Sequence, residues 1–116
     1  MPEVKAKLRE TRDRLSESEL EVGRFYYRIR WYPGALDRLN LLLKDDPEFT
    51  SRDEAYFYIG ESLLKASRPA EALPYFDRIV NEFGQSEHLE AAKKRIEEIK
   101  NPPPPAAAKA TVKTSS

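Results

Sequence analysis

Apolar side chains recur along the first thirty residues at helical spacing. They follow one another at intervals of four and seven residues, with three at the end, and so fall on one face of a helix: Val4, Leu8, Leu15, Val22, Tyr26 and Ile29. Ser16 and Glu19 have capping-box spacing, which would allow a new helix to begin near Ser16. Because the apolar phase runs through that point unchanged, we predict one continuous helix.

Proline and serine residues mark the next two helices. Pro33 is predicted to open the second helix, because proline is tolerated in a first turn, where its missing N–H has no partner to lose. Pro47 is predicted to end that helix. Ser51 and Glu54 again have capping-box spacing, and so we predict that a third helix begins at Ser51.

The fourth and fifth helices precede an abrupt change in composition. Pro69 is predicted to open the fourth helix, and Gly84 to end it. Ser86 is predicted to cap the fifth helix, which reaches residue 100. Four prolines and then Ala, Lys, Thr and Ser residues follow Asn101. Such a segment buries too little apolar surface to become ordered, and so we expect a disordered tail over 101–116 with a short polyproline II stretch.

Two stretches of the chain align at a fixed offset of 37 residues. A period of about 20–50 residues is typical of solenoids, in which each repeat is one supersecondary unit. We predict an all-α, antiparallel helix-hairpin solenoid of about five helices over residues 1–100, with repeats at about 16–49 and 53–86 and a flanking helix at 87–100. The aligned pairs are Gly23 with Gly60, Ala35 with Ala72, Leu39 with Phe76, Leu42 with Ile79, and Pro47 with Gly84.

These positions resemble the tetratricopeptide (TPR) pattern, in which a glycine, an aromatic, a small residue, a bulky residue and a proline follow in order. The second repeat departs from it at Leu63 and Gly84, and the period of 37 exceeds the usual value of about 34. Three extra residues, 50–52, lengthen the loop between the repeats. The first repeat supplies Gly23, Tyr26, Ala35, Leu39 and Pro47.

A narrower resemblance covers about residues 5–100. Four ungapped runs carry it: Asp13-Arg14-Leu15, Glu19-Leu20-Glu21-Val22, Arg24-Phe25-Tyr26 and Ala35-Leu36-Asp37-Arg38. They are similar to the C-terminal half of the BamD family, the TPR lipoproteins of the outer-membrane β-barrel assembly machinery. This chain differs from the family pattern at Ser16, Gly23 and Asp37, and it carries neither a signal peptide nor a lipid-modified cysteine.

The resemblance implies a non-catalytic scaffold at the periplasmic face of the outer membrane. Its partner would be a POTRA domain of a BamA-like protein, together with unfolded outer-membrane protein segments, and Arg38 matches the family position implicated in that docking. Membrane association would require a lipid anchor that this chain lacks. The alternative is a general TPR adaptor, either a periplasmic coordinator of the envelope and cell division or, if Met1 is the true start, a cytoplasmic co-chaperone.

Composition narrows the chemistry further. Twenty basic residues balance twenty acidic ones among 116, so we expect no nucleic-acid partner, because phosphate binding requires an excess of positive charge. The chain has no cysteine and a single histidine, His88, which we interpret as an exposed residue without metal-binding partners. The adjacent carboxylates Asp45 and Asp46 are expected to be solvated. We therefore expect no enzyme activity, cofactor or metal.

The candidate site is a groove for a protein partner. On the repeat register, the first helix of each repeat lines the concave face, at Glu17, Leu20, Arg24, Tyr27 and Arg28 in one repeat and Glu54, Phe57, Glu61, Leu64 and Lys65 in the other. Aromatic anchors with charges of both signs are typical of protein interfaces. Equally, these side chains could pack on a neighbouring helix, and Arg38 could pair with an acid on its own helix such as Asp45. The candidate binding residues are Arg24, Tyr27, Arg28, Trp31, Arg38, Phe57 and Glu61.

Overall fold

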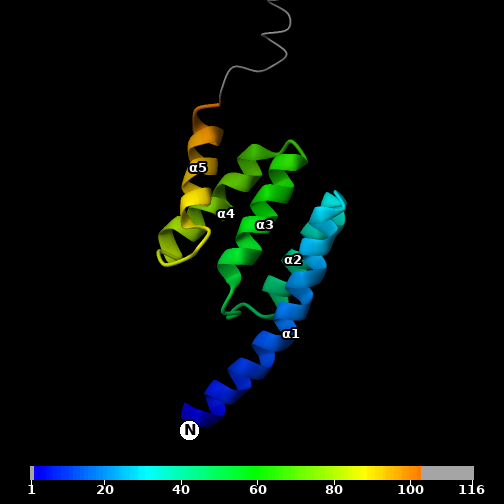
Figure 1. The fold of residues 1–116 in the computed structure, drawn as a ribbon, viewed down its shortest axis with the longest axis vertical. Coiled ribbons are helices and arrows are strands. Elements are labelled where there is room, and N and C mark those ends of the chain that lie inside the picture. The colour runs from blue at the N-terminus through cyan, green and yellow to red at the C-terminus, as the bar shows by residue number, and fades with distance from the viewer. Residues whose placement is uncertain (1, 103–116) are drawn as a thin grey trace, which may run out of the picture.

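A computed structural model describes residues 2–102, and this range forms five α-helices and no strand. Consecutive helices pack against each other as a row of antiparallel hairpins (Figure 1), which confirms the all-α fold class predicted from the sequence. The predicted disordered tail lies outside the described residues from 103 onward. The helices are α1 (Pro2–Arg28), α2 (Tyr32–Asp45), α3 (Arg52–Lys65), α4 (Pro69–Glu82) and α5 (Leu89–Lys100).

The helix boundaries follow the proline positions more closely than the serine positions. The first helix runs through Ser16 without a break, as predicted, and the fourth begins at Pro69. The predicted cap at Ser86 is wrong, because α5 begins three residues later. The Ser86 hydroxyl instead accepts the His88 N–H at 3.0 Å and donates to the Asp53 carboxylate, so it ties the loop before α5 to the start of α3.

The backbone itself repeats every 37 residues. Two residues after the end of α1 and of α3 the chain has a positive φ, at Arg30 (66°) and Ser67 (63°). In each case the next N–H, from Trp31 or Arg68, bonds to a carbonyl five residues back. This is the 6→1 bond of the Schellman motif, which closes a helix end. The predicted period is therefore visible as two identical turns, each of which starts the following helix.

Two glycines let the paired helices of each hairpin approach closely. A Cβ atom added at Gly23 would lie 2.5 Å from Leu39, and one at Gly60 would lie 2.5 Å from the Phe76 ring. Both of these large side chains are fully buried and belong to the same core cluster. A larger residue at either glycine would therefore push the hairpin apart.

The apolar stripe along α1 lies on the exposed side of that helix. Leu8, Leu15 and Ile29 are 64%, 56% and 53% exposed, whereas Ser16 and Leu20 are fully buried. The helix is therefore buried along a different line from the one marked by its apolar periodicity. Val22 and Tyr26 of the stripe are half-buried, whereas Leu8, Leu15 and Ile29 stay exposed on α1, the outermost helix of the array (Figure 1).

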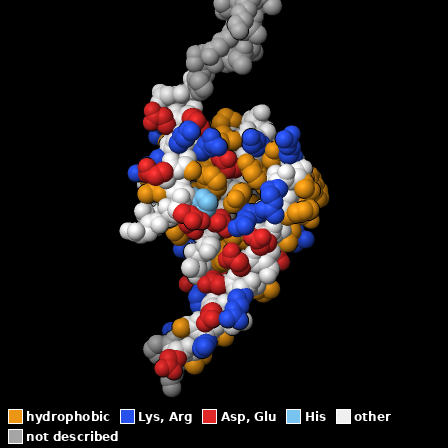
Figure 2. Space-filling view, viewed as in Figure 1, with side chains coloured by type: hydrophobic (Ala, Val, Ile, Leu, Met, Phe, Trp, Pro, Cys, Tyr) orange, Lys and Arg blue, Asp and Glu red, His pale blue; other side chains and the backbone are white. Residues whose placement is uncertain are grey.

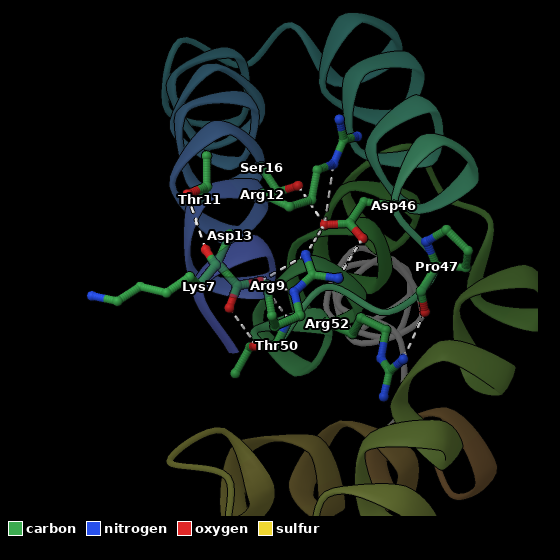
Figure 3. A network of polar contacts seen from close by, with 10 residues as sticks. All are labelled: Lys7, Arg9, Thr11, Arg12, Asp13, Ser16, Asp46, Pro47, Thr50 and Arg52. Carbon is green, nitrogen blue, oxygen red and sulfur yellow. Dashed lines mark hydrogen bonds and ion pairs between the residues drawn. The ribbon is translucent and has the colours of Figure 1, made fainter. Parts of the chain in front are cut away.

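The loop before α3 is held against α1 by a polar network (Figure 3). Arg9 donates to both carboxylate oxygens of Asp46, and the Ser16 hydroxyl donates to one of them at 2.6 Å. The Thr50 N–H and hydroxyl both donate to Asp13. The three additional loop residues are thus anchored where Thr50 meets α1.

Asp46 corrects the expectation that the Asp45–Asp46 pair is solvated, because it is only 4% exposed. Burial alone would raise the pKa of its carboxyl group. The hydrogen bonds from Arg9 and Ser16 and the positive charges of Arg9 and Arg12 outweigh that effect, so the pKa of Asp46 lies below its usual value. The carboxylate is therefore part of the fold.

Candidate protein-binding surface

The structure divides the predicted site residues between two regions. One region lies where α1, α3 and α5 meet and contains Arg24, Tyr27, Phe57 and Glu61. The other lies at the end of the array, with Arg38 on α2 and Trp31 immediately before that helix. Arg28 is exposed at the end of α1 and belongs to neither group. The side chains of the two regions differ in their exposure to solvent.

Glu61 is the centre of the first region. It is 6% exposed and forms a bidentate ion pair with Arg95 of α5, with Nε–Oε1 and Nη2–Oε2 distances of 2.6 and 3.1 Å. The Tyr27 hydroxyl donates to the same carboxylate at 3.5 Å. The hydrogen bond that Arg95 donates to Glu61 raises the pKa of Arg95, and burial followed by the Glu61 charge raises the pKa of Tyr27 to about 12. One carboxylate therefore joins three helices.

Glu54 makes a second junction, about two turns away on α3. Arg24 donates to its Oε2 at 2.7 Å, and the His88 Nε2 lies 3.3 Å from its Oε1. The His88 ring also stacks on Phe57, with centroids 4.6 Å apart. This corrects the view of His88 as an exposed residue, because its side chain is 17% exposed. Figure 2 shows it, in pale blue, surrounded by acidic and basic side chains.

His88 also has acidic neighbours that the sequence did not indicate. Ligand atoms of Glu54, Glu87 and His88 lie within 4.8 Å of one another, a spacing compatible with a divalent cation. The Glu54 carboxylate, however, already has Arg24 as its counter-ion at 2.7 Å. The existing ion pair and hydrogen bond account for this arrangement without any ion.

The six residues Arg24, Tyr27, Glu54, Glu61, His88 and Arg95 are called here the inner network. Leu20, predicted to line a groove on the same side, is instead fully buried in the core. Because the charges of the inner network are matched within the chain, a peptide could reach them only by breaking these pairs. The inner network therefore serves to hold α1, α3 and α5 together.

Arg38 lies in a different environment, at the end of the array. Its Nη1 is 3.3 Å from the Glu19 Oε2 atom on α1, and both side chains are 42% exposed. Its acidic partner thus lies on the neighbouring helix and is not Asp45 of its own helix. Leu15 and Leu41 line the same shallow groove. Trp31 lies against Gly34, one turn before Arg38 on α2.

We call this surface the end face and define it by Leu15, Glu19, Trp31, Arg38 and Leu41. Three of its members are large apolar side chains with high exposure: Leu15 at 56%, Trp31 at 52% and Leu41 at 47%. A soluble helical array normally keeps such side chains under a neighbouring element. The end face therefore combines exposed apolar side chains with the predicted site residue Arg38.

The second repeat has a surface that corresponds to the end face. The residues 37 positions after Glu19, Arg38 and Leu41 are Tyr56, Tyr75 and Arg78. These three line a groove together with Asn40 and Leu43 of α2, and Tyr56 is 4% exposed. In the second repeat this face thus lies beside α2, where Tyr56 is buried, although Arg78, the counterpart of Leu41, has a 52% exposed side chain. Within residues 2–102 no helix lies on the same side of the first repeat.

None of the helices described in residues 2–102 combines the length and the apolar character needed to span a membrane. No protein-family model matches this chain, and no match is found among curated proteins or among solved structures.

Proposed function

We propose that this chain is a non-catalytic scaffold that binds another protein through the end face. The observation that supports it best is the exposure of Leu15, Trp31 and Leu41 around the Arg38–Glu19 pair. Tryptophan and arginine are the residue types that most often dominate binding energy at protein interfaces. An apolar centre beside a solvated ion pair is typical of a docking surface.

The resemblance to the BamD family suggests the class of partner. We propose that the end face docks onto a POTRA domain of a BamA-like protein, at the periplasmic face of the outer membrane. Arg38 fits such a role because a guanidinium group pairs with carboxylates through two hydrogen bonds and also stacks on aromatic rings. Its present partner, Glu19, is exposed and could be replaced by an acid of the incoming protein.

A binding experiment tests this proposal. The chain would be titrated against the POTRA domains of the BamA-like protein from the same organism. Arg38→Glu should weaken binding by on the order of 2 kcal/mol, about thirtyfold in Kd, because it places a negative charge against the partner's acids. Trp31→Ala should weaken binding by a similar amount through lost apolar contact.

Arg68→Glu is the matched control. Like Arg38, Arg68 is an exposed arginine paired with one glutamate, here Glu71, but it lies at the start of α4, away from the end face. It should bind as the wild type does. Absence of binding by folded wild-type protein, or equal losses in Arg38→Glu and Arg68→Glu, would refute the proposed docking surface.

A further inference from the structure

The groove that contains the two end-face leucines, Leu15 and Leu41, is lined by charged residues arranged symmetrically about them. On α1, Leu15 lies three residues after Arg12 and four before Glu19. On α2, Leu41 lies three residues after Arg38 and four before Asp45. All six side chains line one groove. The same spacing, basic residue first and acidic residue second, therefore occurs on both helices.

The two helices run in opposite directions, so these charges alternate in sign across the groove. Glu19 of α1 pairs with Arg38 of α2 at one end, 3.3 Å apart. Arg12 and Asp45 lie at the other end, where α1 supplies the positive charge and α2 the negative one. Leu15 and Leu41 occupy the middle, and they are 56% and 47% exposed.

We propose that a second copy of this chain covers the end face in a symmetric dimer. A two-fold axis that crosses both helices between the leucines turns the partner's α1 antiparallel to α1. This places Arg12 opposite Glu19 of the partner subunit, because both lie about one turn from Leu15. Likewise Arg38 comes opposite Asp45 of the partner subunit. Each pair occurs twice, as an isologous interface requires.

The stripe on α1 extends the same contact. Leu8, Leu15 and Ile29 are all more than half exposed, and with Val22 they recur every seven residues. A seven-residue apolar repeat is the pattern by which two helices pack along their length. Figure 2 shows hydrophobic side chains along the outer edge of the C-terminal half of α1. With the axis beside Leu15, an antiparallel α1 from a second copy would place Leu8 opposite Val22 of the partner subunit.

This inference concerns the surface assigned to the partner under the proposed function, but it does not depend on that partner's identity. The dimer would cover Arg38, so self-association and partner binding would compete for one face. The two proposals can fail separately, since the test below uses the chain alone and contains no POTRA domain.

Sedimentation equilibrium of the full chain over a wide concentration range measures the self-association directly. The wild type should be in monomer–dimer equilibrium, and Leu15→Arg should be monomeric, because it places a charge at the centre of the contact. Arg38→Glu should weaken the dimer at least about tenfold by facing Asp45 of the partner subunit. Circular dichroism confirms that each variant is folded.

The double variant Arg38→Glu with Asp45→Arg gives the sharpest result. It reverses both members of the proposed intersubunit pair, so the dimer should recover most of its strength. Within one chain, Glu19 would still face a second glutamate, so recovery can come only from the contact between subunits. The same variant should remain defective towards a POTRA domain, which keeps the two proposals distinguishable.

Three results would overturn the dimer. The first is a folded wild type that stays monomeric at the highest concentration. The second is a dimer unaffected by Leu15→Arg, since its interface would then lie elsewhere. The third is a double variant as weak as Arg38→Glu alone.

Discussion

The inner network and the end face contain the same kinds of side chain, but those of the inner network are largely buried and those of the end face are exposed. In the inner network, arginines and glutamates from three helices neutralise each other, and Glu61 is 6% exposed. On the end face, the Arg38–Glu19 pair is 42% exposed on both sides and lies beside uncovered leucines. Composition alone does not separate them. The difference teaches that burial, and not composition, separates a charged cluster that holds helices together from one that stays open to solvent.

Among these changes, removing Glu61 should break the inner network and lower the free energy of unfolding the most. Glu61→Ala leaves Arg95 and Tyr27 without their shared acceptor. Loss of one member of a buried pair destabilises a protein by 3–5 kcal/mol. Because Arg95 stays one-third exposed and can be hydrated, we expect about 3 kcal/mol from urea denaturation.

Glu98→Ala gives the control on the same arginine. Glu98 also pairs with Arg95, at 2.9 Å, but its side chain is 42% exposed. We expect a loss below about 0.5 kcal/mol. Equal losses in the two variants would mean that burial of Glu61 does not distinguish the inner network from an ordinary surface pair.

Asp46 tests whether the polar network that holds the loop before α3 against α1 also stabilises the fold, as the inner network is expected to do. Asp46→Asn removes the negative charge that accepts hydrogen bonds from Arg9 and Ser16, and we expect a loss of about 2 kcal/mol at neutral pH. Asp45→Asn, at the exposed neighbouring position, should change the free energy of unfolding by less than about 0.5 kcal/mol.

The pH dependence follows from the direction of the Asp46 shift. Its pKa is lower in the folded chain than its usual value. The stabilisation is therefore complete above the unfolded pKa of about 3.9 and is lost as the pH falls through the folded value. Denaturation curves from neutral pH to pH 2 should show a steeper acid loss in the wild type than in Asp46→Asn. Parallel curves would mean that Asp46 does not stabilise the fold through its charge.

Leu15 should have the smallest effect on stability. Leu15→Ala should shift the free energy of unfolding of dilute protein by less than about 0.5 kcal/mol, because the side chain is mostly exposed. Leu20→Ala, five residues later on the same helix, should cost about 3 kcal/mol, because that side chain is fully buried. Similar losses at both positions would show that the end face is part of the core after all.

The sequence predicted those parts of the fold that are set by local chemistry. Prolines at positions 33 and 69 lie in the first turns of α2 and α4, and the glycines at 23 and 60 mark close helix contacts. These signals act over a few residues or repeat at a fixed period, and so they can be recognised without a structure. The period of 37 itself was confirmed by the matched turns at Arg30 and Ser67.

The pairing of charges could not be predicted in the same way. Arg24 meets Glu54 and Ser16 meets Asp46 across 30 residues of chain, and only the packing of α1 on its neighbours determines those contacts. The register did place Arg24, Tyr27 and Glu61 on one side of the array. That register sets Arg24 at the position corresponding to Glu61, whereas in the structure Arg24 binds Glu54 and Glu61 binds Arg95. The exposed side of α1 was likewise not predictable from periodicity alone, because serine and glycine lie on its buried side.

The two matched turns have a consequence for the modularity of the chain. Each turn leaves the backbone in the same conformation, so the segment between Trp31 and Arg68 begins and ends in equivalent geometry. Such a segment is a cassette: a second copy inserted after residue 67 should add one hairpin while every later helix keeps its local register. The length of the array is thus a parameter of this architecture, set by how many cassettes stand between the first helix and the last.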